Sequence, residues 1–160
     1  MLKGDGMKYK FDKCGEKLKP GDFEKVEKIV GAALPDSIKN LYKKYNGGQV
    51  EGGRCVFVNS SNGMEYEVRN FLPMIYPRYK EDSLVEDSYV FFVKEKKLIP
   101  KKYIPIAMDS GGFRYCVSIV DEKVYFFNFD NEDVKNGKEL VADSIEDFIN
   151  SLLAEDEAYK

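Results

Sequence analysis

The sequence YIPIAMDSGGFRYCVSIVDEKVYFFNF, from Tyr103 to Phe129, decides the fold because it is the longest dense run of strand-forming residues in the chain. In its middle, one set of alternating positions is apolar and the other is mixed: Phe113, Tyr115, Val117 and Ile119 against Arg114, Cys116, Ser118 and Val120. This two-residue period predicts a β-strand with one face in the core and a second, wetter face.

A polar turn at residues 121–123 separates this strand from a second apolar run, Val124 to Phe129. Nearly every position of that run is apolar or aromatic, which is typical of a strand covered on both faces. Together the two runs predict an antiparallel hairpin inside a larger sheet, and we expect the rest of the chain to pack around it.

The chain has 160 residues, of which 43% are apolar and 33% are charged, and its formal net charge is −3. This length suits one domain with a full core, and no stretch approaches the roughly 20 apolar residues of a membrane span. The Lys-rich N-terminus lacks the apolar segment of a secretory signal. We therefore expect a cytoplasmic protein with an N-terminal extension at residues 1–21 and a single domain at residues 22–160.

Apolar residues at helical spacing predict helices in four segments: residues 22–30, 35–45, 84–94 and 144–153. Asp22 suits the N-cap of the first helix, and Ser83 or Asp82 suits that of the third. Residues 84–94 also have strong strand propensity, so a strand stays the alternative to the helix that we favour there. Residues 54–58 and 64–72 predict a second hairpin, and residues 73–82 predict a loop.

The chain contains no histidine, which excludes His-dependent acid–base and triad mechanisms. The segment from Asp109 to Gly112 resembles the surroundings of a serine-protease nucleophile, but Ser110 has no histidine to activate it, and a tight turn explains the same residues. The glycines of residues 47–53 lack the Lys and Ser/Thr of a phosphate-binding P-loop. Carboxylate pairs, as in some hydrolases, stay open because a sequence does not show their separation.

Neither a metal site nor a cofactor is predicted. Four oxygen-bearing residues could in principle ligate calcium, but their spacing departs from the EF-hand pattern: Asp130, Asn131, Glu132 and Asp133. Three widely spaced cysteines favour reduced thiols over disulfides or zinc ligands: Cys14, Cys55 and Cys116. The basic segment KEKKLIPKK, residues 94–102, allows a phosphate-binding interpretation, although a solvated helix end is the simpler one.

Three segments in this order resemble the SUKH superfamily, which groups yeast cell-wall regulators with bacterial immunity proteins: LPDSIKNLYKKYNGG (34–48), YIPIAMDSGGFRYCVSI with VYFFNFD (103–130), and DSIEDFINSLL (143–153). The resemblance implies an α+β fold, a single domain with a central, mostly antiparallel sheet flanked by helices. The motif residues that we expect to act structurally are Leu34, Pro35, Asn46, Gly47, Gly48, Gly111 and Gly112. One departure is that family members often carry tryptophan in the strand at residues 124–129, whereas this chain has none.

The resemblance implies binding rather than catalysis. Many bacterial members neutralise a cognate toxin, often a nuclease or a nucleic-acid deaminase, so we expect a toxin protein as partner, without direct contact to nucleic acid or membrane. Two other functions stay open: a regulatory or scaffolding module that binds a cellular protein, and, more remotely, a carboxylate-dependent hydrolase.

Two surfaces are candidates for the partner. The acidic end of the chain suits the basic cleft of a nuclease, because opposite charges speed association: Glu155, Asp156 and Glu157. The second candidate rests on tyrosine and arginine, which often dominate interfaces, and on the turn beside them: Tyr76, Arg78, Tyr79, Tyr103, Asp109 and Ser110.

Overall fold

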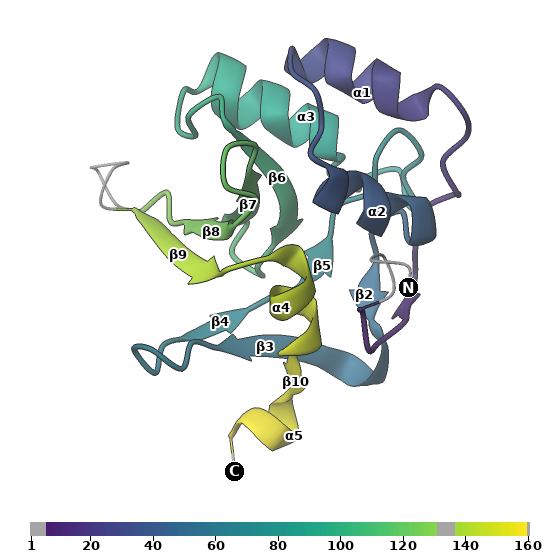
Figure 1. The fold of residues 1–160 in the computed structure, drawn as a ribbon. Coiled ribbons are helices and arrows are strands. Elements are labelled where there is room, and N and C mark those ends of the chain that lie inside the picture. Colours follow the sequence, from purple (N-terminus) through teal and green to yellow (C-terminus); the bar gives the residue numbers. More distant parts are fainter. Residues whose placement is uncertain (1–5, 131–136, 160) are drawn as a thin grey trace.

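A five-stranded antiparallel sheet at the centre of the computed structural model contains the predicted hairpin (Figure 1). Its strands follow the order β5 (Asn70–Phe71), β6 (Tyr103–Met108), β7 (Arg114–Ser118), β8 (Val124–Phe127) and β9 (Lys138–Ala142). The hairpin β7–β8 is confirmed, with Tyr115 opposite Phe126. The structure describes residues 6–130 and 137–159, so Asn131, Glu132 and Asp133 of the candidate calcium segment lie outside the described residues.

Two smaller antiparallel sheets accompany the large one. In the first, β3 (Arg54–Val58) lies between β4 (Glu65–Glu67) and β10 (Leu153–Ala154). In the second, β1 (Phe11–Asp12) pairs with β2 (Gln49–Val50). The predicted second hairpin is therefore confirmed, but its second strand is interrupted, because β5 leaves the small sheet and joins the edge of the large one.

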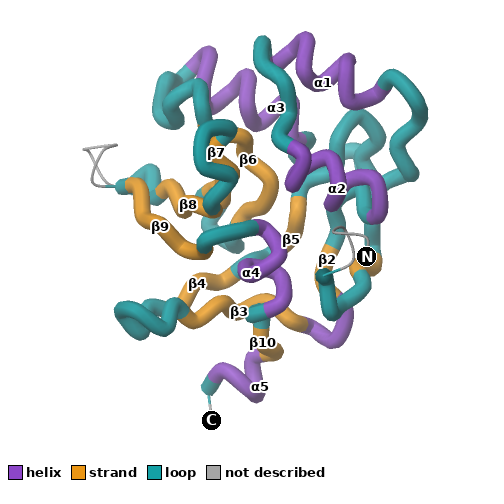
Figure 2. Tube along the Cα trace, in the orientation of Figure 1, coloured by secondary structure: helices purple, strands orange, loops and turns teal. Residues whose placement is uncertain are grey.

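The helices lie around these sheets, as Figure 2 shows in purple. They are α1 (Asp22–Val30), α2 (Asp36–Lys44), α3 (Val85–Tyr89), α4 (Ile145–Asn150) and α5 (Glu155–Ala158), with a short 3-10 turn, η1, at Glu51–Gly53. α3 continues directly into a π-helical segment, η2 (Val90–Glu95), so the helix favoured for residues 84–94 is confirmed. Within residues 6–130 and 137–159, no helix is long and apolar enough to cross a membrane.

The helix ends follow local chemistry, with some corrections to the predicted caps. α1 ends at Gly31 in the left-handed region, as predicted, but its N-cap is Gly21 rather than Asp22, whose carboxylate accepts a hydrogen bond from Lys19 N at 2.7 Å. The N-cap of α3 is Leu84, which makes no side-chain cap. Ser144 caps α4 by accepting a hydrogen bond from Asp147 N at 3.0 Å. α4 ends earlier than predicted, and the residues after it form β10.

The main core joins the large and small sheets through α4, which lies between them in Figure 1. The ring of Phe148 on α4 is fully buried and lies 5.5 Å from Phe57 on β3, 6.0 Å from Phe71 on β5 and 5.3 Å from Tyr115 on β7, measured between ring centroids. One side chain thus contacts three strands from two sheets. The chain is an α+β domain with a central antiparallel sheet flanked by helices, as predicted.

The wetter face predicted for β7 is wrong, because Arg114, Cys116 and Ser118 are all buried. A second apolar cluster covers that face: Ile99, Tyr103, Cys116 and Phe127, with Phe92, Val93, Tyr125 and Phe129 packed against it. Only Val120, beyond the end of the strand, is exposed, at 74%. The periodicity of one strand does not reveal that η2 and the segment after it lie over its second face.

The sequence predicts that residues 1–21 are an N-terminal extension. The described part of this segment, from residue 6 onward, packs onto the domain. Phe11 is buried in the main core and stacks on Tyr45 with ring centroids 4.9 Å apart.

Cys14, Cys55 and Cys116 are free thiols, of which Cys116 is fully buried.

Candidate functional site

The tyrosine-containing loop at residues 73–82 is held at its start by Asn46, the residue that follows helix α2 and Tyr45. The side-chain amide of Asn46 accepts a hydrogen bond from Met74 N at 2.7 Å and donates to Met74 O at 2.9 Å. It also donates to Glu16 O at 2.8 Å. A single buried amide thereby joins the end of α2, the loop and the N-terminal segment.

The far end of this loop is organised by Asp82. Its carboxylate accepts hydrogen bonds from Arg78 N at 2.8 Å and Tyr79 N at 2.9 Å, and the Arg78 guanidinium lies over the Tyr79 ring, 4.7 Å from its centroid. Tyr79 is 53% exposed, whereas Tyr76 is half-buried beside Lys19. The loop therefore presents Arg78 and Tyr79 to solvent in a fixed arrangement.

Gly47 and Gly48 bring the loop and the N-terminal strand close to the end of α2. Both have positive φ, +74° and +110°. A Cβ on Gly47 would lie 2.6 Å from Pro73 N, and a Cβ on Gly48 would lie 2.4 Å from Asp12 O. Glycine is required at both positions, because the backbone there is left-handed and because a Cβ would collide with main-chain atoms of neighbouring segments. Nearby, Leu34 is buried and Pro35 is the N-cap of α2.

The turn from Asp109 to Gly112 is tied to the small sheet. The Asp109 carboxylate accepts hydrogen bonds from Gly111 N and Phe113 N, at 3.0 and 2.9 Å, and Gly112 has φ +88°. Ser110 donates from its N to Glu67 Oε1 at 2.8 Å and from its hydroxyl to Glu67 Oε2. Glu67 on β4 therefore fixes the tip of a turn that belongs to the large sheet.

The acidic end of the chain follows β10, the strand at the opposite edge of the same small sheet from β4. Glu157 on α5 forms an ion pair with Arg54 on β3 at 3.2 Å, and Glu155 Oε1 lies 3.9 Å from the sulfur of Cys55. Burial, with smaller contributions from Glu155 and Glu67, raises the pKa of the Cys55 thiol, which keeps it protonated and unreactive. Asp156 is exposed.

Tyr103 does not belong to either surface. Its side chain is 2% exposed and packs between the rings of Tyr125 and Phe127, with its hydroxyl 3.1 Å from the Lys138 ammonium. It therefore presents almost no area to a partner, and we omit it from the candidate surface.

Two adjoining cavities connect the acidic end of the chain with the tyrosine-containing loop; we call them together the groove. The first, of about 360 Å³, is lined by Glu67, Glu155, Cys55 and Asp12 among others, and the second, of about 210 Å³, by Arg78, Tyr79 and Asp82 among others. The two cavities share five lining residues: Lys13, Gln49, Arg69, Asn70 and Phe71. The candidates near the loop and near α5, distant in sequence, thus border one continuous surface feature.

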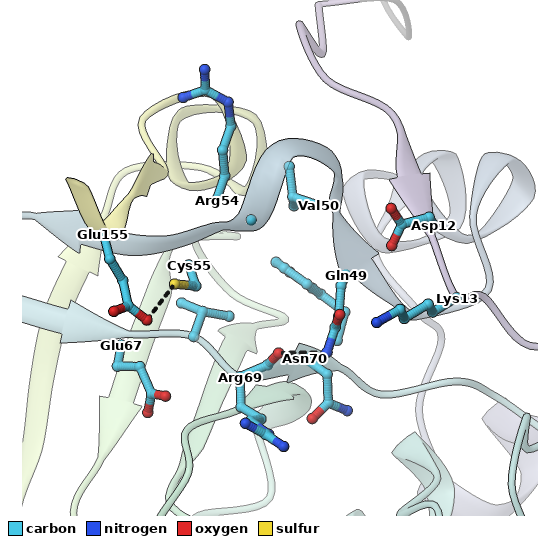
Figure 3. A pocket seen from close by; sticks show the side chains of 13 residues that line it. Asp12, Lys13, Gln49, Val50, Arg54, Cys55, Glu67, Arg69, Asn70 and Glu155 are labelled. Carbon is cyan, nitrogen blue, oxygen red and sulfur yellow. Dashed lines mark hydrogen bonds between the residues drawn. The ribbon is translucent and has the colours of Figure 1, made fainter. Parts of the chain in front are cut away.

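Charge varies along the groove. Figure 3 shows Glu155, Cys55 and Glu67 at one end of the first cavity and Asp12 with Lys13 at the other, with Gln49, Arg69 and Asn70 between them. Gln49 donates to the Arg69 carbonyl at 3.5 Å, and the Arg54 side chain points away from the cavity. The groove is therefore acidic beside α5 and basic in its middle, around Lys13 and Arg69.

Sequence reasoning missed the residues that connect these surfaces, above all Glu67. The EYE pattern of residues 65–67 does carry a signal, because acidic residues on both sides of a buried tyrosine are typical of an exposed strand face. Lys13 and Arg69 carry no such signal. Their position depends on the pairing of β1 with β2 and on the place of β5 at the sheet edge.

The groove has the chemistry of a binding surface. In the described part of the chain, no three His, Cys, Asp or Glu side chains are placed to hold a metal ion. What the groove offers is a mixture of carboxylates, cations, amides and one exposed tyrosine. This composition suits contact with a polar protein surface.

The chain is similar to known proteins over most of its length. The chain is similar to the SPbeta prophage-derived uncharacterized protein YokK of Bacillus subtilis (strain 168), with 26% identity over 165 aligned positions that cover 94% of this chain and 80% of that protein. The model of the SMI1 / KNR4 family (SUKH-1) matches residues 17–151, which is most of the chain. The resemblance seen in the three sequence segments is thus confirmed: the chain belongs to the SMI1 / KNR4 family (SUKH-1).

Proposed function

We propose that this protein is a cytoplasmic immunity protein that binds one cognate toxin through the groove and blocks it without chemical turnover. Membership of a family whose members are generally immunity proteins or regulators supports this proposal. The observation that carries the site is the continuity of the groove, since Glu67, Glu155 and the pair Arg78–Tyr79 border one surface.

The acidic end favours a toxin with a basic cleft. Glu155 and Asp156 are exposed on α5, and Glu65 and Glu67 lie on the neighbouring strand β4. A nuclease or a nucleic-acid deaminase needs a basic surface for the phosphate backbone, and an inhibitor of opposite charge gains association rate at such a surface. The basic middle of the groove and Tyr79 would then meet complementary polar and apolar contacts, which adds specificity.

The fixed geometry of the groove supports inhibition by blocking. Asp82, Asn46 and Glu67 each hold a main-chain segment of its border by hydrogen bonds of 2.7–2.9 Å. A surface that is already ordered loses little conformational entropy on binding, so more of the contact energy contributes to affinity.

The test is co-expression of the chain with the product of a neighbouring toxin gene, followed by purification of the complex. We expect a stable complex in which the toxin is inactive, and full toxin activity once the complex is denatured and the toxin is refolded alone. Unchanged toxin mass by mass spectrometry would agree with blocking, whereas a modified toxin would contradict it. Failure to bind any neighbouring toxin, with capture of a cellular regulator instead, would favour the regulatory function.

The groove itself is tested with Tyr79→Ala in the same assay. We expect the variant to fold normally, because Tyr79 is more than half exposed, and to lose toxin affinity at least several-fold. The matched control is Val120→Ala, which also truncates an exposed apolar side chain, on a turn that does not line the groove. Equal affinity of both variants would show that the toxin contacts another surface.

A further inference from the structure

Arg114 is a buried cation that forms no direct ion pair within the described residues, although the Asp109 carboxylate acts on its charge from a greater distance. Its side chain belongs to β7 and is 6% exposed. None of the ion pairs found among residues 6–130 and 137–159 includes it. Buried charges in proteins are ordinarily paired, because removing an uncompensated charge from water is strongly unfavourable. Arg114 therefore needs an explanation beyond the packing of the sheet.

The neutral groups around Arg114 satisfy part of its hydrogen-bonding capacity. Nη1 donates to Gly112 O, Nε lies 3.3 Å from the Ser88 hydroxyl, and Nη2 lies 3.5 Å from the Ser83 hydroxyl. The guanidinium carbon also lies 4.8 Å from the centroid of the Phe92 ring. A guanidinium has five N–H donors. These contacts engage three of them, two at long distances to hydroxyl groups that can rotate to donate to an anion.

A cavity of about 530 Å³ opens onto this guanidinium. Its walls combine the charged and hydroxyl groups with an apolar and aromatic side: Ser83, Asp87, Ser88, Val90, Phe91, Phe92, Glu95 and Arg114. Its size is that of a small-molecule site, and the mixture of apolar walls with few convergent polar groups is typical of one. It shares no lining residue with the groove.

The local backbone is also unusual. Val90, Phe91, Phe92 and Glu95 belong to η2, a π-helical segment. Such segments are rare and occur often at functional sites. Phe91 remains 43% exposed at the cavity, so apolar area is left there for a ligand to cover.

From these observations we propose that the cavity over Arg114 binds a small monocarboxylate with an apolar body. The carboxylate accepts hydrogen bonds from the free N–H groups of Arg114 and from the Ser83 and Ser88 hydroxyls, because a guanidinium fork matches a carboxylate in shape and charge. The apolar body lies against Val90, Phe91 and Phe92. Asp87 and Glu95, which also line the cavity, oppose a multiply charged anion such as phosphate.

Two kinds of molecule supply such a carboxylate: a free carboxylic acid, or a bound protein through a glutamate side chain. We would titrate the full chain, labelled with ¹⁵N, with sodium benzoate, with neutral benzamide, with inorganic phosphate, and with the blocked dipeptide acetyl-Glu-Phe-amide. The resonances to follow are Arg114 Nε–H and the amides of Ser83, Ser88 and Phe91. Saturation by benzoate is expected at roughly 0.1–10 mM, the range of a ligand with so few atoms.

The proposal predicts saturable shifts with benzoate and at least tenfold weaker effects with benzamide and phosphate. Tighter binding of the dipeptide than of benzoate would assign the carboxylate to a protein partner, and the reverse order would assign it to a free acid. Equal responses to benzoate and benzamide, or no saturation by either carboxylate, would overturn the proposal and leave Arg114 as a structural donor to Gly112 O.

Two variants separate binding from folding. Arg114→Met removes the charge, should abolish benzoate binding, and is checked for folding by its amide spectrum. Arg114→Lys retains the charge without the planar fork and should bind benzoate several-fold more weakly; it serves if the methionine variant does not fold. Lys28→Gln, an exposed cation on α1, is the control and should bind as the parent does. Parent-like binding by both Arg114 variants would also contradict the proposal.

Discussion

The side-chain amide of Asn46 forms two hydrogen bonds with the main chain of Met74, as acceptor from N at 2.7 Å and as donor to O at 2.9 Å. Met74 thus has its main-chain N–H and C=O both bonded by one side chain, as they would be by a neighbouring β-strand. This pairing joins the end of α2 to a loop that lies 28 residues later, and both groups are buried. The position of Arg78 and Tyr79 at the groove therefore depends on a residue that lies outside it.

Asn46→Ala should lower the free energy of unfolding by about 2–4 kcal/mol, because it leaves Met74 N buried without its partner and removes one of the two hydrogen bonds to Met74 O, the other being donated by Tyr76 N. Urea denaturation measures the change. Asn40→Ala, an exposed asparagine on α2, is the control and should change stability by less than about 0.5 kcal/mol. An Asn46 variant as stable as this control would show that the amide contributes nothing to holding the loop.

Gly47→Ala and Gly53→Ala form a matched pair. Both glycines have similar φ, +74° and +67°, so each alanine costs about 1–2 kcal/mol of left-handed strain. Only at Gly47 would the new Cβ meet main-chain atoms, with Pro73 N at 2.6 Å, whereas no atom lies within 4 Å at Gly53. We expect Gly47→Ala to be the more destabilising by at least about 1 kcal/mol in urea denaturation. Equal losses would refute the close contact.

Phe126→Ala should destabilise the protein by about 3–5 kcal/mol, since the Phe126 ring is 8% exposed and lies 4.8 Å from the Tyr115 ring and 5.6 Å from the Tyr66 ring. Chemical denaturation is again the measurement. Val120→Ala, at an exposed site, should leave the midpoint nearly unchanged. A loss below about 1 kcal/mol for Phe126→Ala would mean that this aromatic cluster packs loosely.

Glu86 makes stability depend on pH. Its Oε2 accepts a hydrogen bond from Ile75 N at 2.9 Å, while its Oε1 is buried without a partner among the residues that the structure describes. Burial is the main reason why the pKa of this carboxyl lies above the ordinary value of 4.5, with a smaller contribution from Asp87. The folded state therefore binds the proton of the Glu86 carboxyl more tightly than the unfolded state does. The stability contributed by this group is complete below 4.5 and is lost as pH rises through the folded pKa.

Glu86→Gln removes that titration. Relative to the parent protein, the variant should gain stability as pH rises from 5 to 8, and urea denaturation at both pH values measures the difference. Glu24→Gln, which removes an exposed carboxylate on α1, is the control and should show a smaller dependence. A parent-to-Gln difference that does not change with pH would contradict the raised pKa.

The acidic end of the groove should set the rate of toxin association. Glu155→Lys with Asp156→Lys should slow association several-fold at low salt and much less at high salt, because salt screens exposed charges. Glu157 is left unchanged, since its reversal would break the ion pair with Arg54. The control is Glu24→Lys with Asp130→Lys, which changes net charge equally on exposed sites outside the groove. Equal slowing by both double variants would assign the effect to net charge alone.

Local chemistry was enough to predict the hairpin β7–β8, the helices α1 to α4 and the turn from Asp109 to Gly112, because each depends on neighbouring residues, whereas the short helix α5 was not predicted. What the sequence could not show is which surfaces meet. The burial of Arg114 depends on η2, and the burial of Tyr103 depends on β8, so neither follows from the strand in which each residue lies.

The contacts of the candidate site also join distant parts of the sequence, so they could not be predicted either. The bond between Ser110 and Glu67 joins residues 43 positions apart, and the pair Arg54–Glu157 joins residues 103 apart. A sequence shows the charges of such residues but not their pairing. The acidic end and Arg78–Tyr79 could therefore be named as two alternatives, whereas their connection through Lys13 and Arg69 required the fold.

The pairing of β10 with β3 affects the order in which the two sheets can form during protein synthesis. Leu153 lies opposite Val56, so the small sheet stays incomplete until residues 153–154 have left the ribosome. The large sheet needs residues only up to β9 and can form earlier. Domains fold as their segments emerge, at about 5–20 residues per second, so the acidic end of the groove is the last part to assemble. A chain truncated before residue 153 would therefore lose the third strand of the small sheet together with Glu155, although all five strands of the large sheet would still be present.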